Sequence, residues 1–193
     1  RDNAGIAVAS LDQMPEFTVL DSALRVGLTQ VEWPARLQLL ASGSLTRNVP
    51  LDVQLWVDGG HNAAAGTALA NVVRKHLMDR PLRLIVGMLD NKSPEEFLAP
   101  LAPYVERFWG ISIAGESNSI SAANLAICAS RLGLTAEKAP NIVAAIKAAS
   151  ATQSHVLICG SLYLAGQVLA ANNETLNGRP QRKLRPSLRK RHV

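Results

Sequence analysis

Residues 53–70, VQLWVDGGHNAAAGTALA, constrain the fold more than any other part of the chain. The stretch opens with an apolar, β-branched run that is too short for a helix. It closes with an alanine-rich segment that carries leucine and valine at helical spacing. Between the two, Gly59 and Gly60 let the chain turn where a side chain would clash. This order predicts a strand, a tight turn and a helix.

Three polar side chains follow this expected strand. Asp58 stands at its carboxyl end, His61 follows the two glycines, and Asn62 is a suitable N-cap for the helix. In an open α/β sheet, ligands bind outside the carboxyl ends of the strands, near helix N-termini. These side chains are therefore candidates for a ligand site. Asp and Asn beside a Gly-Gly turn are also ordinary turn chemistry without a ligand, so both interpretations stay open at this point.

The composition predicts a globular domain with a basic tail. Hydrophobic residues make up 48% of the 193 residues and aromatic residues only 4%, which favours a sizeable aliphatic core. The net charge is +5, but residues 179–193 hold seven Lys or Arg and no acid, which leaves about −2 for residues 1–178. No apolar run is long enough to span a membrane. Cys128 and Cys159 lie in apolar surroundings without metal-ligand spacing, which favours buried thiols in a reducing compartment.

Strand and helix patterns alternate along the rest of the chain. We expect an α/β fold of the Rossmann-like kind, with a mostly parallel sheet and helices on both faces. The apolar run at 82–88 is typical of a strand buried on both faces. The expected strands are 37–41, 53–58, 82–88, 107–113 and 155–159. The expected helices are 2–13, 21–28, 63–78, 97–105 (interrupted by prolines), 121–132, 141–150 and 164–171.

Four motifs in order resemble one known family. They are WPARLQ (33–38), VDGGHN (57–62), VGMLDNK (86–92) and ICGSLYLAG (158–166). The usual family forms are WPGRLQ, LDGAHN, GMLxDKD and GSLY or GSFY, and the opening DNAGIAVASL resembles the last helix of the family's central domain. The chain thus resembles the C-terminal domain of folylpolyglutamate synthase and dihydrofolate synthase, members of the Mur ligase superfamily. Each motif is weak alone, but four in order are specific.

The resemblance implies an ATP-dependent amide ligase. ATP would phosphorylate a carboxylate of dihydropteroate or a reduced folate, and L-glutamate would attack the acyl phosphate. It further implies that Arg36 and Asp58 bind ATP, that His61 is catalytic and lies near L-glutamate, and that Ser161 binds L-glutamate. From the residues alone, Ser161 is better explained as a helix N-cap, and Lys92 either meets phosphate or is solvated. ATP and Mg²⁺ are the implied cofactors, with the metal ligands in a preceding domain and none in this chain.

The chain also departs from the family pattern. Ala35 replaces Gly and Gly60 replaces Ala, and we expect little effect from either change. Residues 90–93 lack the usual acidic ending, so no role for that loop's acid is carried over. The sequence contains no GxxxxGK[ST] phosphate loop, and we expect that loop in an N-terminal portion of a longer protein. We expect this chain to be inactive by itself.

The resemblance also implies an organisation and partners. We expect residues 1–30 to end the central ATP-binding domain with its linker, 31–172 to form the C-terminal domain, and 173–193 to be a disordered basic tail. The expected partners are ATP, L-glutamate and a folate, in a cytoplasmic monomer without membrane or nucleic-acid partners. Two alternatives stay open: a nucleotide-binding domain that has lost catalysis, and a nucleic-acid-binding module built on the tail. No aromatic residues interleave with the tail's positive charges for base stacking, and no GxGxxG follows a strand.

Overall fold

A computed structural model describes residues 2–14, 16, 18–150 and 153–173. The chain divides into two units, Arg1–Pro34 and Ala35–Val193. The first unit contains helices α1 (Asp2–Asp12) and α2 (Asp21–Gln30), as the sequence predicts for this segment. Apart from Asn173, the expected basic tail lies outside the described residues. Among the described residues, no helix has the length and apolar character needed to cross a membrane.

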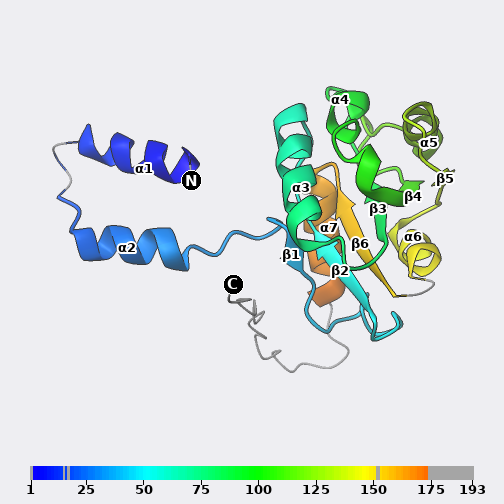
Figure 1. The fold of residues 1–193 in the computed structure, drawn as a ribbon, viewed down its shortest axis with the longest axis horizontal. Helices are drawn as coiled ribbons and strands as arrows, with labels where there is room; N and C mark the ends of the chain where they lie inside the picture. The colour runs from blue at the N-terminus through cyan, green and yellow to red at the C-terminus, as the bar shows by residue number, and fades with distance from the viewer. Residues whose placement is uncertain (1, 15, 17, 151–152, 174–193) are drawn as a thin grey trace. The chain divides into compact units, whose positions relative to one another are not determined.

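The second unit contains a six-stranded sheet in the order β1-β2-β6-β3-β4-β5 (Figure 1). Only β1 pairs antiparallel within this sheet, and the other strands are mutually parallel. The predicted fold class, a mostly parallel α/β sheet, is therefore confirmed. The strands are β1 (Gln38–Leu39), β2 (Val53–Val57), β3 (Leu82–Val86), β4 (Val105–Gly110), β5 (Ala136–Lys138) and β6 (Ser154–Cys159).

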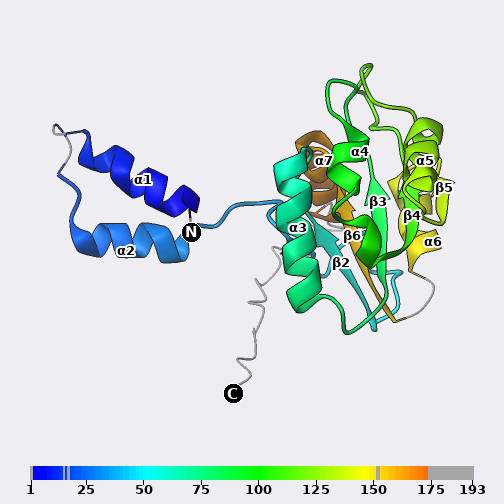
Figure 2. The same cartoon turned by 45° about the horizontal axis from the view of Figure 1, so that its top comes forward.

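Helices cover both faces of this sheet, also as predicted (Figures 1 and 2). One face packs against α3 (Ala63–His76), α4 (Pro94–Leu98) and α5 (Ala122–Arg131). The other packs against α6 (Ile142–Ala149) and α7 (Leu162–Asn173). The central strands supply both cores, because alternate side chains of a strand point to opposite faces. In β6, Leu157 joins the α3 side and Ile158 joins the α7 side.

Local signals account for most of the helix boundaries. Asn62 caps α3 as predicted, since its side-chain oxygen accepts a hydrogen bond from the Ala65 N–H at 2.9 Å. The helix expected over 97–105 is wrong, because α4 ends at Leu98. A short 3₁₀ helix, Ala102–Tyr104, follows, and Val105 already belongs to β4. Prolines at 100 and 103 remove donors that a continuous helix would need.

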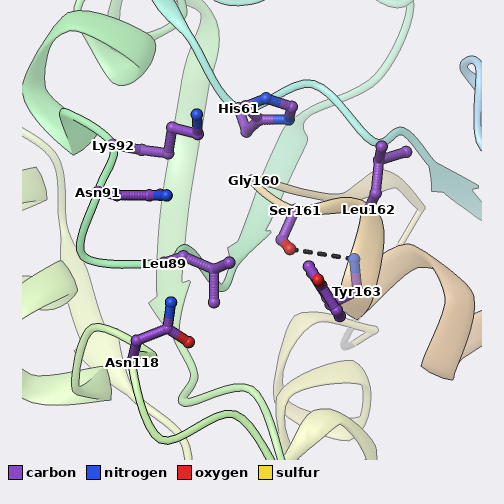
Figure 3. A pocket seen from close by; sticks show the side chains of 9 residues that line it. All are labelled: His61, Leu89, Asn91, Lys92, Asn118, Gly160, Ser161, Leu162 and Tyr163. Carbon is purple, nitrogen blue, oxygen red and sulfur yellow. Dashed lines mark hydrogen bonds between the residues drawn. The ribbon is translucent and has the colours of Figure 1, made fainter.

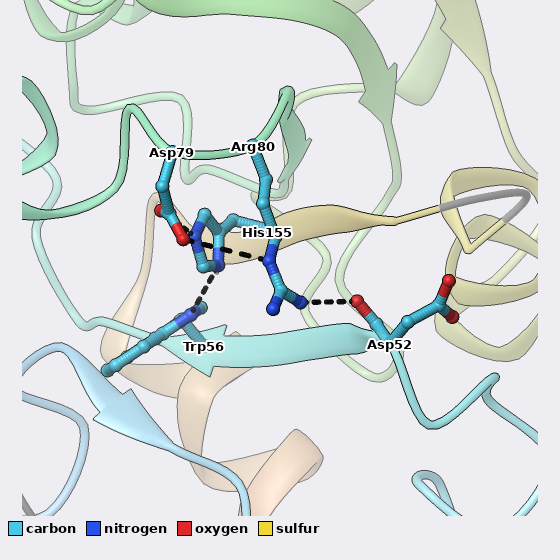
Figure 4. A network of polar contacts seen from close by, with 5 residues as sticks. All are labelled: Asp52, Trp56, Asp79, Arg80 and His155. Atoms are coloured by element: carbon cyan, nitrogen blue, oxygen red, sulfur yellow. Dashed lines mark hydrogen bonds and ion pairs between the residues drawn. The ribbon is translucent and has the colours of Figure 1, made fainter.

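A buried histidine near the start of β6 contacts the segment before β3 and a side chain of β2 (Figure 4). His155, 3% exposed, lies 2.8 Å from Asp79 Oδ1 through Nε2, and its Nδ1 lies 3.4 Å from Trp56 Nε1. Because the indole N–H can only donate, Nδ1 accepts and Nε2 carries the proton that is donated to Asp79. Arg80 donates from Nη1 to the Asp52 carbonyl at 2.6 Å. His155 thus joins the start of β6 to the segment before β3 and to Trp56 of β2, and Arg80 joins that same segment to the start of β2.

Candidate functional site

The sheet order creates a crevice at the carboxyl ends of β2, β6 and β3. These strands are neighbours, but the helix after β6 leaves on one face while the helices after β2 and β3 leave on the other. Open α/β sheets bind ligands at the point where the connections from neighbouring strands run to opposite faces of the sheet. An open pocket of about 320 Å³ lies at this edge (Figure 3). Its lining residues are His61, Leu89, Asn91, Lys92, Asn118, Gly160, Ser161, Leu162 and Tyr163.

His61 enters the pocket from the turn between β2 and α3. Its Nδ1 lies 3.0 Å from the Gly59 carbonyl oxygen. Since a carbonyl only accepts, Nδ1 is protonated, and Nε2 is the ring nitrogen that remains to meet a ligand. The side chain is half-buried, so its orientation is held while one edge stays accessible. The structure thus places His61 where the strand–turn–helix pattern predicted a candidate ligand residue.

Ser161 reaches the same pocket from the turn between β6 and α7. It is 4% exposed, and its Oγ accepts a hydrogen bond from the Tyr163 N–H at 3.1 Å (Figure 3). The hydroxyl therefore caps α7, as the residues alone suggested, and its own proton remains for a ligand acceptor. Gly160 precedes it with φ +104°, and a Cβ there would lie 2.7 Å from the Gly87 carbonyl oxygen. Glycine is required at this turn both by φ and by the closeness of the neighbouring backbone.

Two loops that the sequence did not connect complete the pocket. Asn91 and Lys92 follow β3, whereas Asn118 belongs to the loop after β4. The loops are joined by a hydrogen bond from the Asp90 N–H to the Asn118 carbonyl at 2.9 Å and by a bridge between Leu89 and Ser119. Nothing in the local pattern around Asn118 marks this residue as pocket-lining, because strand pairing brings it there, whereas Tyr163 belongs to the same GSLY motif as Ser161.

The pocket is suited to an anionic ligand. Of the described residues that line it, Lys92 is the one cation and none carries a carboxylate. The N-terminus of α7, a helix of 12 residues, lies at its wall and adds a favourable field for negative charge. Asn91 and Asn118 supply amide donors, and Figure 3 shows them on the side opposite Ser161. Among the described residues, no group of three or more His, Cys, Asp or Glu side chains could hold a metal ion.

Asp58 and Arg36 do not line this pocket. Asp58 is 6% exposed, and its Oδ1 accepts from the Gly60 N–H at 2.7 Å. Its Oδ2 accepts from the Leu37 N–H, also at 2.7 Å. Arg36 is exposed in the turn before β1. The two residues predicted to bind ATP are thus linked through the backbone of Leu37, while His61 and Ser161 share the pocket.

The turn that carries Arg36 corrects one expectation. Ala35 has φ +56°, in the left-handed region that favours glycine. The replacement of glycine by alanine at this position was expected to have little effect. It instead places a buried methyl group on a backbone conformation that costs free energy for an L-residue.

Cys159 lies beneath the site at the end of β6. Complete burial raises the pKa of its thiol well above the usual range, and the nearby Asp58 carboxylate raises it further. The residue is therefore a neutral thiol at physiological pH and serves as packing, as the sequence predicted for both cysteines. Cys128 is only half-buried, and its pKa is raised mainly by desolvation.

Comparison with known proteins identifies relatives of this domain. Residues 42–171 match the family model described as dihydrofolate synthetase, C-terminal domain. A curated dihydrofolate synthetase from Saccharomyces cerevisiae is 24% identical over 191 residues, covering 90% of this chain and 44% of the yeast protein. The chain thus spans less than half the length of this relative.

Solved structures show the same fold. A folylpolyglutamate synthase from Mycobacterium tuberculosis complexed with ADP is 25% identical, with a TM-score of 0.70, over 85% of this chain and 38% of that chain. A bifunctional folylpolyglutamate synthase/dihydrofolate synthase with Mn, AMPPNP and L-glutamate bound is 26% identical, with a TM-score of 0.65, over 81% and 36% of the two chains. Together with the family model, which matches more than half of the chain, these likenesses lead to one assignment: the chain belongs to the family of dihydrofolate synthetase C-terminal domains.

Proposed function

We propose that this chain is the C-terminal part of an ATP-dependent ligase that adds L-glutamate to dihydropteroate or to a reduced folate. The observation that carries the proposal is the carboxylate-free pocket lined by His61, Lys92 and Ser161 in a domain of this family. L-Glutamate and the phosphoryl group are both anionic, and the pocket offers a cation, amides and a helix N-terminus to them. In the proposal the protein acts as a cytoplasmic monomer.

In the proposed reaction, ATP transfers its γ-phosphoryl group to the acceptor carboxylate and leaves as ADP. The amino group of L-glutamate attacks the acyl phosphate, an amide forms, and phosphate leaves. His61 Nε2 would contact the amino acid beside the transferred phosphate, and Ser161 Oγ would donate to a glutamate carboxylate. Lys92 would offset the negative charge that develops on the phosphoryl oxygens. Catalysis of this kind depends mainly on positioning and electrostatic stabilisation.

ATP would contact this domain at the 35–37 turn. The exposed guanidinium of Arg36 suits phosphate, because its fork is planar and permanently charged. Asp58 would take part in ATP binding together with Arg36. Mg²⁺, when bound, would offset negative charge on the phosphates, and an N-terminal portion of the ligase would supply its ligands and the phosphate loop. The relatives with bound ADP, or with AMPPNP and Mn, support nucleotide and metal use by such ligases.

The test is an assay of the complete ligase that contains this chain. ADP release is measured with ATP, L-glutamate and either dihydropteroate or a reduced folate, for the natural protein and for His61→Ala. We expect glutamate-dependent turnover that falls about a hundredfold or more in the variant, as when a group that stabilises developing charge is removed. His76→Ala is the matched control, since His76 lies exposed in the last turn of α3.

Three outcomes would contradict parts of the proposal. Unchanged turnover in His61→Ala would remove His61 from the site while keeping the ligase assignment. An equal loss in His76→Ala would mean that the assay reports folding rather than chemistry. No turnover with either acceptor would overturn the ligase proposal and favour a nucleotide-binding domain that has lost catalysis.

A further inference from the structure

The turn that carries Arg36 has a backbone conformation that side-chain-bearing residues rarely adopt. Ala35 has φ +56° and Leu37 has φ +39°, so both neighbours of Arg36 lie in the left-handed region. Such conformations cost free energy and persist where surrounding contacts enforce them. Arg36 itself is exposed, so its guanidinium is presented by the turn rather than by packing.

Three hydrogen bonds hold this turn. The Leu37 N–H donates to Asp58 Oδ2 at 2.7 Å, and the Gly59 N–H donates to the Ala35 carbonyl at 2.8 Å. The Ala35 N–H donates to Gln38 Oε1 at 3.0 Å. Two of the three partners, Asp58 and Gly59, directly follow β2. The conformation around Arg36 is therefore set by the carboxyl end of that strand.

The Asp58 carboxylate is engaged in this task. The side chain is 6% exposed, and each of its oxygens already accepts a backbone N–H, one from Leu37 and one from Gly60. Hydrogen bonds from neutral donors to an ionised acceptor are short and strong. One carboxylate thus joins the Arg36 turn to the turn that carries His61.

We propose that Asp58 is a positioning residue whose carboxylate holds the 35–37 turn and thereby presents Arg36 to a nucleotide phosphate. This inference rests on the proposed function, in which Arg36 contacts ATP, and it gives Asp58 an indirect role in nucleotide binding. The loss of the carboxylate then matters because the left-handed turn relaxes and Arg36 is no longer held in place.

The first test is a double-mutant cycle on ADP binding by the complete ligase, measured by calorimetry. Arg36→Ala should weaken ADP binding by at least about tenfold, as expected for loss of a charge-assisted contact. Asp58→Asn keeps the shape of the side chain but places an amide NH₂ donor against a backbone N–H donor. This variant should weaken ADP binding by about fivefold or less. The double variant should bind no more weakly than Arg36→Ala, because both changes remove the same contact. Independent, multiplied losses would overturn the inference.

The second test is rescue by Ala35→Gly. Glycine adopts φ +56° without cost, so the turn needs less help from the carboxylate. Ala35→Gly should restore most of the ADP affinity lost in Asp58→Asn. Failure of this rescue would mean that Asp58 acts on the nucleotide by another route. Asp52→Asn, at the opposite end of β2, is the matched control and should bind ADP normally.

A third measurement separates this inference from the proposed function. Amide hydrogen exchange at Leu37, measured without nucleotide, should quicken in Asp58→Asn and slow again when Ala35→Gly is added. Unchanged exchange at Leu37 would overturn the positioning role whatever the affinities are. Normal ADP binding by Arg36→Ala, with the exchange result as expected, would instead overturn the assignment of Arg36 to ATP in the proposed function.

Discussion

Two glycines inside helices give predictions of opposite sign for the same substitution. Gly66 lies in the first half of α3, where it faces α4. A Cβ there would lie 2.2 Å from the Phe97 carbonyl oxygen and 3.1 Å from Pro100 Cγ. Phe97 is fully buried, and its carbonyl is backbone, so neither partner can rotate away. Alanine at position 66 can fit only if α3 and α4 move apart.

The two effects of Gly66→Ala can be compared in magnitude. Forcing an extra methyl group into a packed contact costs about 1–3 kcal/mol. Replacing glycine by alanine in a helix interior returns about 1 kcal/mol. We therefore expect the free energy of unfolding to fall by about 1–2 kcal/mol, with the steric cost at the upper end because the clash is with backbone.

Gly166→Ala is the matched control in α7. Among the residues that the structure describes, no atom lies within 4 Å of the position of a Cβ at residue 166. Only the helix propensity then changes, and we expect a gain of about 1 kcal/mol, or about 2–4 °C in Tm. Urea unfolding followed by far-UV circular dichroism and by tryptophan fluorescence measures both variants. A Gly66→Ala protein as stable as the natural chain, or a destabilised Gly166→Ala protein, would refute the packing argument.

Two titratable groups give further predictions. His155 donates a hydrogen bond to Asp79, and this bond lowers the pKa of the Asp79 carboxyl in the folded protein. The contact therefore stabilises the fold at pH values above the unfolded pKa of about 4. This stabilisation is lost as the pH falls through the lower pKa of the folded state. In Asp79→Asn, the urea midpoint of unfolding should therefore decrease less steeply below about pH 4 than in the natural protein. The same pH dependence in both proteins would contradict a stabilising His155–Asp79 contact. Because burial raises the pKa of Cys159 well above that of a free thiol, a thiol reagent at pH 8 should modify half-buried Cys128 first and Cys159 only in denaturant. Mass spectrometry of the peptides measures the labelling rate of each cysteine. Equal rates for Cys128 and Cys159 would contradict the burial of Cys159.

Elements whose signal is local could be predicted from the sequence. The apolar composition of β2, β3 and β6 predicts that these strands are buried. Asn62 marks the start of α3 because its side chain caps the helix. Such signals depend on residues within one turn or one strand. The strand β5 was missed because its three residues, Ala-Glu-Lys, are largely exposed at a sheet edge and show no apolar run. The sequence predicts a helix over 97–105 with interruptions at the two prolines, but α4 ends at Leu98, before either proline.

Long-range pairing decided the rest of the candidate site. The residues themselves place His61 after one strand and Ser161 after another, and each position follows from a local strand–turn–helix pattern. No local pattern states that β6 lies between β2 and β3, since strand order depends on how helices on both faces pack together. That order is what brings His61, Ser161 and Asn118 to one pocket and leaves Arg36 outside it. The sequence by itself determined the fold class and the strand–turn–helix order around His61 and Ser161, whereas the tertiary structure alone decided which strand ends meet, because contacts between distant segments select the strand order.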